Sequence, residues 1–422
     1  MPSGCVSSQV SRTNSLQGPS LVRPRAPASC NNNLMGILRS RSRPDLLSPQ
    51  STARRPVFPA GAEISPQTRW ARPQSRWIPF HYRETLTTAK IRRADESSAL
   101  DYAAHQLQPD DIGRVRDLLT RGDTDGLLVM HHGKVVYEYL VDGVPAWQTH
   151  GLNSASKVFT GCVAAILADQ GKLSWNKPLH DYAPQLNGTG YEGVMMQAAL
   201  DMQSGIVLDP MAEFKALGQH PDQGSEPAIG VAGLTLSVKQ GTGKAAYAPV
   251  CTDTDAVGMA CEQVTGKSMP ELISELIWVP IGAKEDADMT LDHFRTPIYN
   301  GGMCATLQDL GRFTNMLLNK GKVGNKQVVP AAYVEDSTVS TSCLREAMNG
   351  NFYNMPWPGA AFHNTFFLDP DRKATYNYGA FGNLLYVDHD ASACCVLLSA
   401  WEKPNEQIQE WMSALQELVK SL

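Results

Sequence analysis

Two β-hairpin patterns stand far apart in this chain of 422 residues. The first spans residues 127–137 and turns at His132-Gly133, and the second spans 384–398 and turns at 388–391. Short apolar runs joined by turn residues predict paired antiparallel strands. Because helical patterns fill most of the chain between them, we expect strands from both ends to meet in one antiparallel sheet. The pattern predicts an α+β fold in the form of an α/β sandwich.

The expected sheet takes residues from about 125–150 and 370–422, and helices flank it. A mainly helical domain at about 160–340 is expected between the two groups of strands, because Gly and Pro loops break that region into short helical patterns. A last helix is predicted over 406–420 from apolar residues that share one of its sides: Ile408, Trp411, Met412, Leu415 and Leu418.

The first 60 residues differ in composition from the rest of the chain. They contain eight arginines, no lysine and a single acidic residue, Asp45, among many Ser, Pro, Gln and Asn residues. Such a segment cannot bury a core, and it also looks like a transit peptide, although a start site assigned too far upstream explains it equally well. We expect a disordered or transit-like segment over 1–75 and a folded domain over 76–422, with structure beginning near Trp77. The expected location is cytoplasmic, or organellar if the segment is a transit peptide.

Composition narrows the classes of function. Apolar residues make up 42% and charged residues 19% of the chain, which is ordinary for a soluble enzyme. The net charge of -5 gives no reason to expect nucleic acid or an anionic membrane as a partner. No apolar run reaches the roughly 18 residues that a membrane span needs. The nine cysteines are scattered, which fits reduced and mostly buried thiols.

The segment Ser154-Ala155-Ser156-Lys157 places a hydroxyl and an amine one helical turn apart. A serine hydroxyl becomes a nucleophile when a base takes its proton, and a lysine held neutral can be that base. S-x-x-K is the nucleophile motif of penicillin-binding proteins and β-lactamases. Apolar residues then recur at helical spacing and predict a buried helix: Val158, Phe159, Cys162, Val163, Ile166 and Leu167. The sequence therefore predicts a serine acyl hydrolase.

A second S-x-x-K, from Ser174 to Lys177, shows that the short pattern alone is not specific. It follows Gly171 and precedes Pro178, so we expect a turn there rather than a helix. Context therefore favours Ser154 as the nucleophile. The alternative for Ser154 is a helix-capping serine with a solvated lysine.

Five segments in a fixed order lie at 153–161, 200–206, 262–282, 301–310 and 378–383. Together they resemble the serine β-lactamase-like family over the chain from about residue 76 onward. Within that family the resemblance is closest to class C β-lactamases, 6-aminohexanoate-dimer hydrolases and related esterases. It implies the β-lactamase/transpeptidase-like fold, with the site in the cleft between the sheet and the helical domain.

The resemblance also implies a catalytic tyrosine, for which Tyr247 is the candidate. A phenol near an ammonium can relay the serine proton to the leaving group. An alignment without a gap would place Pro249 in the position of the tyrosine, and Pro249 or Cys251 replaces the usual Asn. The alternative for Tyr247 is an ordinary loop residue.

The family's Lys-Thr-Gly strand reads Asn377-Tyr378-Gly379 here, so the lysine that would grip a substrate carboxylate is absent. Asn377 and Gly379 are the candidate substrate-binding residues, the glycine because it lets the backbone approach the acyl group closely. The backbone N–H groups of Ser154 and Ala380 are the candidate oxyanion hole. The alternative is a plain buried strand with glycine bends.

These residues predict a two-step hydrolase for amides or esters of small acyl compounds, with Ser154 as nucleophile, Lys157 as base and Tyr247 as proton relay. The expected partner is a small-molecule substrate, without nucleic acid, membrane, cofactor or metal. The oligomeric state stays open, with a homodimer as one option. The alternatives are a β-lactamase or D-amino-acid peptidase of the same fold and, in another class, a non-catalytic binding protein on this scaffold.

Overall fold

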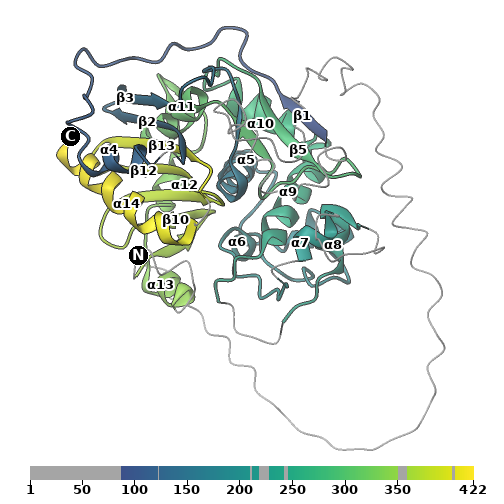
Figure 1. Ribbon diagram of the computed structural model, residues 1–422. Coiled ribbons are helices and arrows are strands. Elements are labelled where there is room, and N and C mark those ends of the chain that lie inside the picture. Colours follow the sequence, from purple (N-terminus) through teal and green to yellow (C-terminus); the bar gives the residue numbers. More distant parts are fainter. Residues whose placement is uncertain are drawn as a thin grey trace, which may run out of the picture. The chain divides into compact units, whose positions relative to one another are not determined.

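A computed structural model describes residues 87–422, except 122, 210–211, 218–227, 242–245, 350–358 and 402–403. The predicted segment 1–75 and the predicted start near Trp77 lie outside the described residues. The described part of the chain is a set of helices around two antiparallel sheets (Figure 1).

The larger sheet has seven strands in the order β3-β2-β13-β12-β11-β10-β9, so strands from both ends of the described chain meet in it. The junction is the antiparallel pair β2 and β13, in which Leu128 faces Val396. Both predicted hairpins, β2 with β3 and β12 with β13, are present. The strands are β2 (Thr124–His131), β3 (Lys134–Leu140), β9 (Ala361–His363), β10 (Phe366–Leu368), β11 (Ala374–Gly379), β12 (Asn383–Asp388) and β13 (Ala393–Ser399).

A second sheet, which the sequence did not predict, has four strands in the order β1-β5-β6-β4. It joins β1 (Thr87–Ile91) and β5 (Ala287–Leu291), which pair along their whole length, to the short strands β6 (Met303–Ala305) and β4 (His150–Gly151). Strand β4 ends shortly before Ser154, so the turn that carries the predicted nucleophile follows directly from a strand of this sheet. A separate two-stranded ribbon is formed by β7 (Lys322–Val323) and β8 (Lys326–Gln327).

Helices make up most of the regular secondary structure that the described chain has between β3 and β9, and the short strands β4 to β8 lie among them. The turn η3 (Asn153–Ser156) leads directly into α5, and the predicted last helix is present as α14. Besides η3, the helical elements of the described chain are α4 (Arg114–Leu119), α5 (Lys157–Asp169), η4 (Leu179–Asp181), η5 (Pro184–Leu186), α6 (Met196–Leu200), α7 (Ala212–Ala216), α8 (Gly230–Ser237), α9 (Cys251–Thr265), α10 (Met269–Ile273), η6 (Ser274–Trp278), α11 (Leu307–Leu318), α12 (Ala331–Asp336), α13 (Ser342–Met348) and α14 (Pro404–Ser421).

The two faces of the larger sheet pack against different helices, because successive side chains of a strand point to opposite sides. Leu127 and Val129 belong to an apolar cluster with residues of α4 and α14, which Figure 1 shows along one face. Leu128 and Met130 belong to a second cluster with residues of α5, α9, α10 and α11. The sandwich of sheet and helices is therefore the predicted α+β fold.

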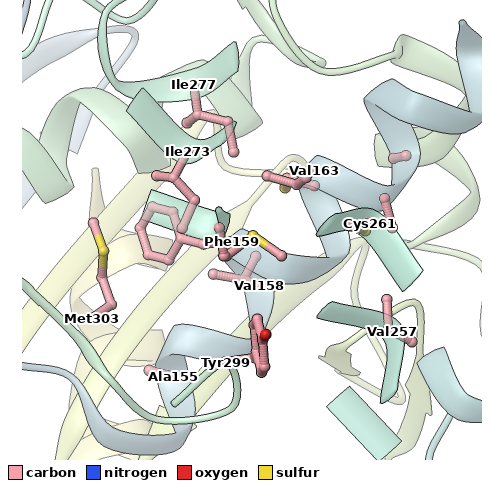
Figure 2. Close-up of a cluster of buried hydrophobic side chains, with 14 of the residues drawn as sticks. Ala155, Val158, Phe159, Val163, Val257, Cys261, Ile273, Ile277, Tyr299 and Met303 are labelled. Atoms are coloured by element: carbon pink, nitrogen blue, oxygen red, sulfur yellow. The ribbon is translucent and has the colours of Figure 1, made fainter. Parts of the chain in front are cut away.

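Helix α5 lies at the centre of the second cluster, and it is buried from Lys157 to Leu167. The ring of Phe159 stacks on Phe313 of α11 at 4.2 Å between centroids. Figure 2 shows Phe159 beside Ile273 of α10, with Val257 and Cys261 of α9 further along. A helix surrounded by apolar side chains cannot shift easily, so the residues at its start are held firmly.

Two expectations drawn from composition can be compared with the described residues. Six cysteines in this part of the chain are free, and all but Cys251 are buried: Cys162, Cys251, Cys261, Cys304, Cys394 and Cys395. Cys343 is disulfide-bonded, so the expectation of reduced thiols does not hold for that residue. Among the described helices, none has the length and apolar character to cross a membrane.

Candidate functional site

Ser154 and Lys157 lie at the junction between a tight turn and a buried helix. Ser154 is in η3 and Lys157 is the first residue of α5, with its side chain only 6% exposed. Asn153, just before the serine, has φ of 51°, a left-handed conformation that asparagine tolerates better than most residues. The helical context predicted for the first S-x-x-K is confirmed.

The smaller sheet holds this turn from one side. The Leu152 N–H donates to the Met303 carbonyl at 2.9 Å, and the Met303 N–H donates to Ser156 Oγ at 3.1 Å. Met303 starts β6, whose residues Cys304 and Ala305 pair with β4. Ser154 therefore lies on a turn that continues a strand of the smaller sheet.

The larger sheet holds the same turn from the other side. Gly379, at the end of β11, lies so close that a Cβ atom there would be 1.9 Å from the Leu152 carbonyl oxygen. The Asn153 side-chain amide donates to the Ala380 carbonyl at 3.0 Å, and Asn383 Nδ2 donates to the same oxygen at 2.9 Å. The structure thus brings Gly379 and Ala380 beside the Ser154 turn. Their roles in substrate binding and in an oxyanion hole stay predictions.

The amino group of Lys157 contacts the backbone of Asn300, a residue whose side chain in turn reaches α9. Its Nζ donates to the Asn300 carbonyl at 3.4 Å, and one turn later Thr160 Oγ1 donates to the Tyr299 carbonyl at 3.0 Å. The side-chain amide of Asn300 in turn donates to Asp255 of α9 and Glu213 of α7. The sequence did not single out Asn300, Asp255 or Glu213, because no local pattern links three residues that are so far apart in the chain.

The carboxyl group of Asp255, which accepts from the Asn300 amide, is strongly perturbed. Burial raises the pKa of Asp255 well above its usual value, and the charge of Glu213 adds to this, while the Asn300 amide and the Lys157 charge act in the opposite direction. Burial and Glu213 also raise the pKa of the Cys251 thiol. Lys157 therefore lies near a thiol and a carboxyl group, both of which burial holds toward the neutral form.

Tyr247 lies just before α9, with 5% of its surface exposed. Its ring is 5.1 Å from the ring of Phe362 in β9 and 6.3 Å from that of Phe367 in β10. Its N–H donates to the Ala347 carbonyl at 3.0 Å. The described ring contacts belong to the apolar cluster at β9 and β10, and the catalytic role of Tyr247 stays a prediction.

Asn377 lies in the middle of β11 with 4% of its surface exposed. Its side-chain amide donates to the Thr365 carbonyl at 2.7 Å, so it ties β11 to the turn between β9 and β10. The predicted role of Asn377 in substrate binding stays a prediction, and the bond to Thr365 gives the residue a structural task in any case.

The second S-x-x-K forms a turn, as predicted. The Lys177 N–H donates to the Ser174 carbonyl at 3.3 Å, and Lys177 is exposed. Within the ranges that the structure describes, no three His, Cys, Asp or Glu side chains come together as ligands of a metal ion would.

Comparisons with known proteins show what the chain is similar to. A family model described as "Beta-lactamase" matches residues 114–418. The chain is 29% identical over 379 residues to the 6-aminohexanoate-dimer hydrolase of Paenarthrobacter ureafaciens, which covers 85% of this chain and 94% of that protein.

Two solved structures share the fold. One is a Bacillus anthracis protein provisionally named a 6-aminohexanoate-dimer hydrolase, with a TM-score of 0.74 and 24% identity over 85% of this chain and 95% of that one. The other is a class C β-lactamase, with a TM-score of 0.55 and 15% identity over 74% of this chain and 96% of that one. The β-lactamase/transpeptidase-like fold is therefore confirmed.

Proposed function

The chain belongs to the β-lactamase family and is a serine hydrolase, and from this premise we propose that it cleaves amide or ester bonds of small acyl compounds through an acyl-enzyme on Ser154. The observation that carries the proposal is the Ser154 turn, fixed by both sheets, with Lys157 one turn further on a buried helix. A nucleophile needs such a fixed position beside its base.

The first step forms the acyl-enzyme. Ser154 Oγ attacks the substrate carbonyl while Lys157 takes the hydroxyl proton. The negative charge on the carbonyl oxygen is met by the backbone N–H groups of Ser154 and Ala380, which the Asn153 and Asn383 amides hold together through the Ala380 carbonyl. The bond to the leaving group then breaks, and Tyr247 relays the proton that Lys157 took from Ser154 to the departing amine or alcohol.

The second step releases the acyl group. Water attacks the ester carbonyl and loses a proton to the same Lys157 and Tyr247 system, and the bond to Ser154 Oγ breaks as the proton returns to it. The products are the free acid and the starting enzyme. This scheme requires no redox step.

The substrate class is proposed from the relative and from the site together. The name of the Paenarthrobacter ureafaciens protein points to a linear amide of an amino acid. At the strand position where a lysine would grip a carboxylate, this chain has a buried asparagine that donates to Thr365. We therefore favour linear amides and short esters, as in a 6-aminohexanoate-oligomer hydrolase or a carboxylesterase.

Covalent labelling tests the proposal most directly. A fluorophosphonate probe should modify Ser154 stoichiometrically and abolish hydrolysis of p-nitrophenyl butyrate, with the modified peptide identified by mass spectrometry. Ser154→Ala should lose both labelling and turnover.

Ser174→Ala is the matched control, because it alters the serine of the second S-x-x-K without touching the buried helix. It should keep labelling and turnover at the wild-type level. Wild-type turnover in Ser154→Ala, or labelling at another serine, would remove Ser154 from the nucleophile's role.

A further inference from the structure

Residues Tyr299 and Asn300 lie between α5 and α9. From α5, Thr160 donates to the Tyr299 carbonyl and Lys157 to the Asn300 carbonyl. From α9, Gly258 lies so close to the Tyr299 ring that a Cβ there would be 2.3 Å from a ring carbon. Figure 2 shows the Tyr299 ring below Val158. The two-residue segment is therefore held by α5 and α9, and its Asn300 carbonyl contacts the amino group of Lys157, the proposed base.

The side chain of Asn300 faces two carboxyl groups. Its Nδ2 donates to Glu213 Oε1 at 2.9 Å and to Asp255 Oδ1 and Oδ2 at 3.1 Å and 3.2 Å. Asn300 and Asp255 are buried, with 0% and 2% of their surfaces exposed. An amide nitrogen has two hydrogens, so it can serve both carboxyls at once. Asn300 thus connects Lys157 to two acids, the buried Asp255 and the half-buried Glu213.

The charges around this connection come from two helices. Glu213 faces it from α7, and Asp255 and Cys251 face it from α9. Burial raises the pKa of Asp255 well above its usual value, and the charge of Glu213 adds to this. A proton held on Asp255 still leaves an oxygen free to accept from Asn300.

We propose that Glu213 and Asp255 are positioning residues for Lys157 and that they act through Asn300. By holding its side-chain amide, they keep the main-chain carbonyl of Asn300 against the Lys157 amino group and aim the amine at Ser154. This inference rests on the proposed function, because it needs Lys157 to act as the base.

Two substitutions of Asp255 separate hydrogen bonding from packing. Asp255→Leu fills the space but removes the acceptor, and it should lower kcat by roughly 10- to 100-fold, as expected when a catalytic group is misplaced, with KM little changed. Asp255→Asn keeps an acceptor for the Asn300 amide and should restore most of kcat. Rates are normalised to the folded fraction by titration with the fluorophosphonate.

The same comparison applies to Glu213, whose carboxylate accepts from the Asn300 amide. Glu213→Leu removes the acceptor and should lower kcat with KM little changed, whereas Glu213→Gln keeps an acceptor and should retain most of kcat. A residue that only packs would not show this recovery by the variant that keeps an acceptor.

Asp253 provides the control, since it is also buried on α9 but bonds to Tyr191 and Ser204 instead. Asp253→Asn should leave the normalised kcat unchanged. The proposal is overturned if Asp255→Leu or Glu213→Leu keeps wild-type kcat, or if Asp255→Asn recovers no more turnover than Asp255→Leu. Loss of turnover in Ser154→Ala together with either result would leave the proposed function standing and reject only this inference.

Discussion

Gly379 lies against the turn that carries the proposed nucleophile, with the position of its missing Cβ only 1.9 Å from the Leu152 carbonyl oxygen. The same Cβ position is 3.0 Å from the Ala155 nitrogen. Both neighbours are backbone atoms, so they cannot rotate away as the end of a side chain would. The close approach of β11 to the Ser154 turn therefore depends on glycine at this position.

The first prediction is that Gly379→Ala separates the strand from the turn. Overpacking of a tight contact costs roughly 1–3 kcal/mol, and a shift of about 1 Å at a catalytic group can cost about 100-fold in rate. We expect kcat/KM for p-nitrophenyl butyrate to fall by roughly that factor, and the melting temperature to fall as well.

Gly126→Ala is the matched control in the same sheet. A Cβ there would meet only the ends of Leu307 and Leu140 side chains, at 3.2 Å and beyond. Its activity should stay within a few fold of wild type. Equal activity in Gly379→Ala and Gly126→Ala would show that the contact with Leu152 does not position the nucleophile.

The second prediction concerns the base. Lys157→Arg should be nearly as damaging as Lys157→Ala, because an arginine does not lose its proton in a protein. General-base catalysis contributes roughly 100- to 10,000-fold, and we expect a loss of that order in kcat for both variants. Lys177→Ala, at the exposed lysine of the second S-x-x-K, should leave kcat unchanged. Substantial turnover in Lys157→Arg would make the lysine an electrostatic group and assign the base to another residue.

The third prediction decides the role of Tyr247. Tyr247→Phe keeps the ring contacts with Phe362 and Phe367 but removes the hydroxyl. If Tyr247 relays the proton, kcat should fall by about 100-fold or more while the melting temperature changes little. Tyr376→Phe is the control, since Tyr376 stacks on Phe367 at 5.0 Å in the same cluster. A fully active Tyr247→Phe would limit Tyr247 to packing.

Much of the fold could be predicted because its signals are local. Short apolar runs and turn residues identify β2, β3, β12 and β13, and apolar spacing identifies α5 and α14. The smaller sheet was missed because β4 and β6 are only two and three residues long, too short for any periodicity. Its register depends on contacts between segments far apart in the chain.

The candidate site divides in the same way. Ser154 and Lys157 share one helical turn, so their spacing can be read directly from the sequence. Asn300 reaches Lys157 only through the packing of α5 against α9, which no local pattern encodes. Asn377 shows the limit of motif reasoning, since the motif gives its position on the strand but not its bond to the Thr365 carbonyl.

The fourth prediction concerns pH and stability. His363 lies between two carboxylates, with Nδ1 2.9 Å from Asp201 Oδ1 and Nε2 2.9 Å from Asp336 Oδ2. Burial opposes the charge of the ring, but the hydrogen bonds and charges of the two carboxylates outweigh it and raise the pKa of His363 to about 9. An unfolded histidine has a pKa of about 6.5, so folding raises the affinity of this ring for a proton.

The sign follows from the raised pKa. The protonated His363 ring adds up to about 3 kcal/mol to the free energy of unfolding. This contribution is fully present below pH ~6.5 and is lost as the pH rises through ~9. Urea unfolding of wild type and His363→Gln should therefore differ most near pH ~6 and least near pH ~9.5. His105→Gln, at an exposed histidine, is the control for replacing a histidine outside the two ion pairs. A difference for His363→Gln that stays constant or grows with pH would contradict the ion pairs.

The last prediction concerns the substrate. A β-lactam presents a carboxylate, and in this chain Asn377 stands where β-lactamases carry a cationic residue. Its amide is buried and donates to the Thr365 carbonyl at 2.7 Å, so it cannot replace a charge-assisted bond worth roughly 1.5–3 kcal/mol, or about one to two decades in specificity. We expect kcat/KM for p-nitrophenyl acetate and butyrate to exceed that for nitrocefin. Lys239→Ala should leave this ratio unchanged, since a change would show that the exposed Lys239 replaces the missing cation. A kcat/KM for nitrocefin well above that for the esters would make the enzyme a β-lactamase.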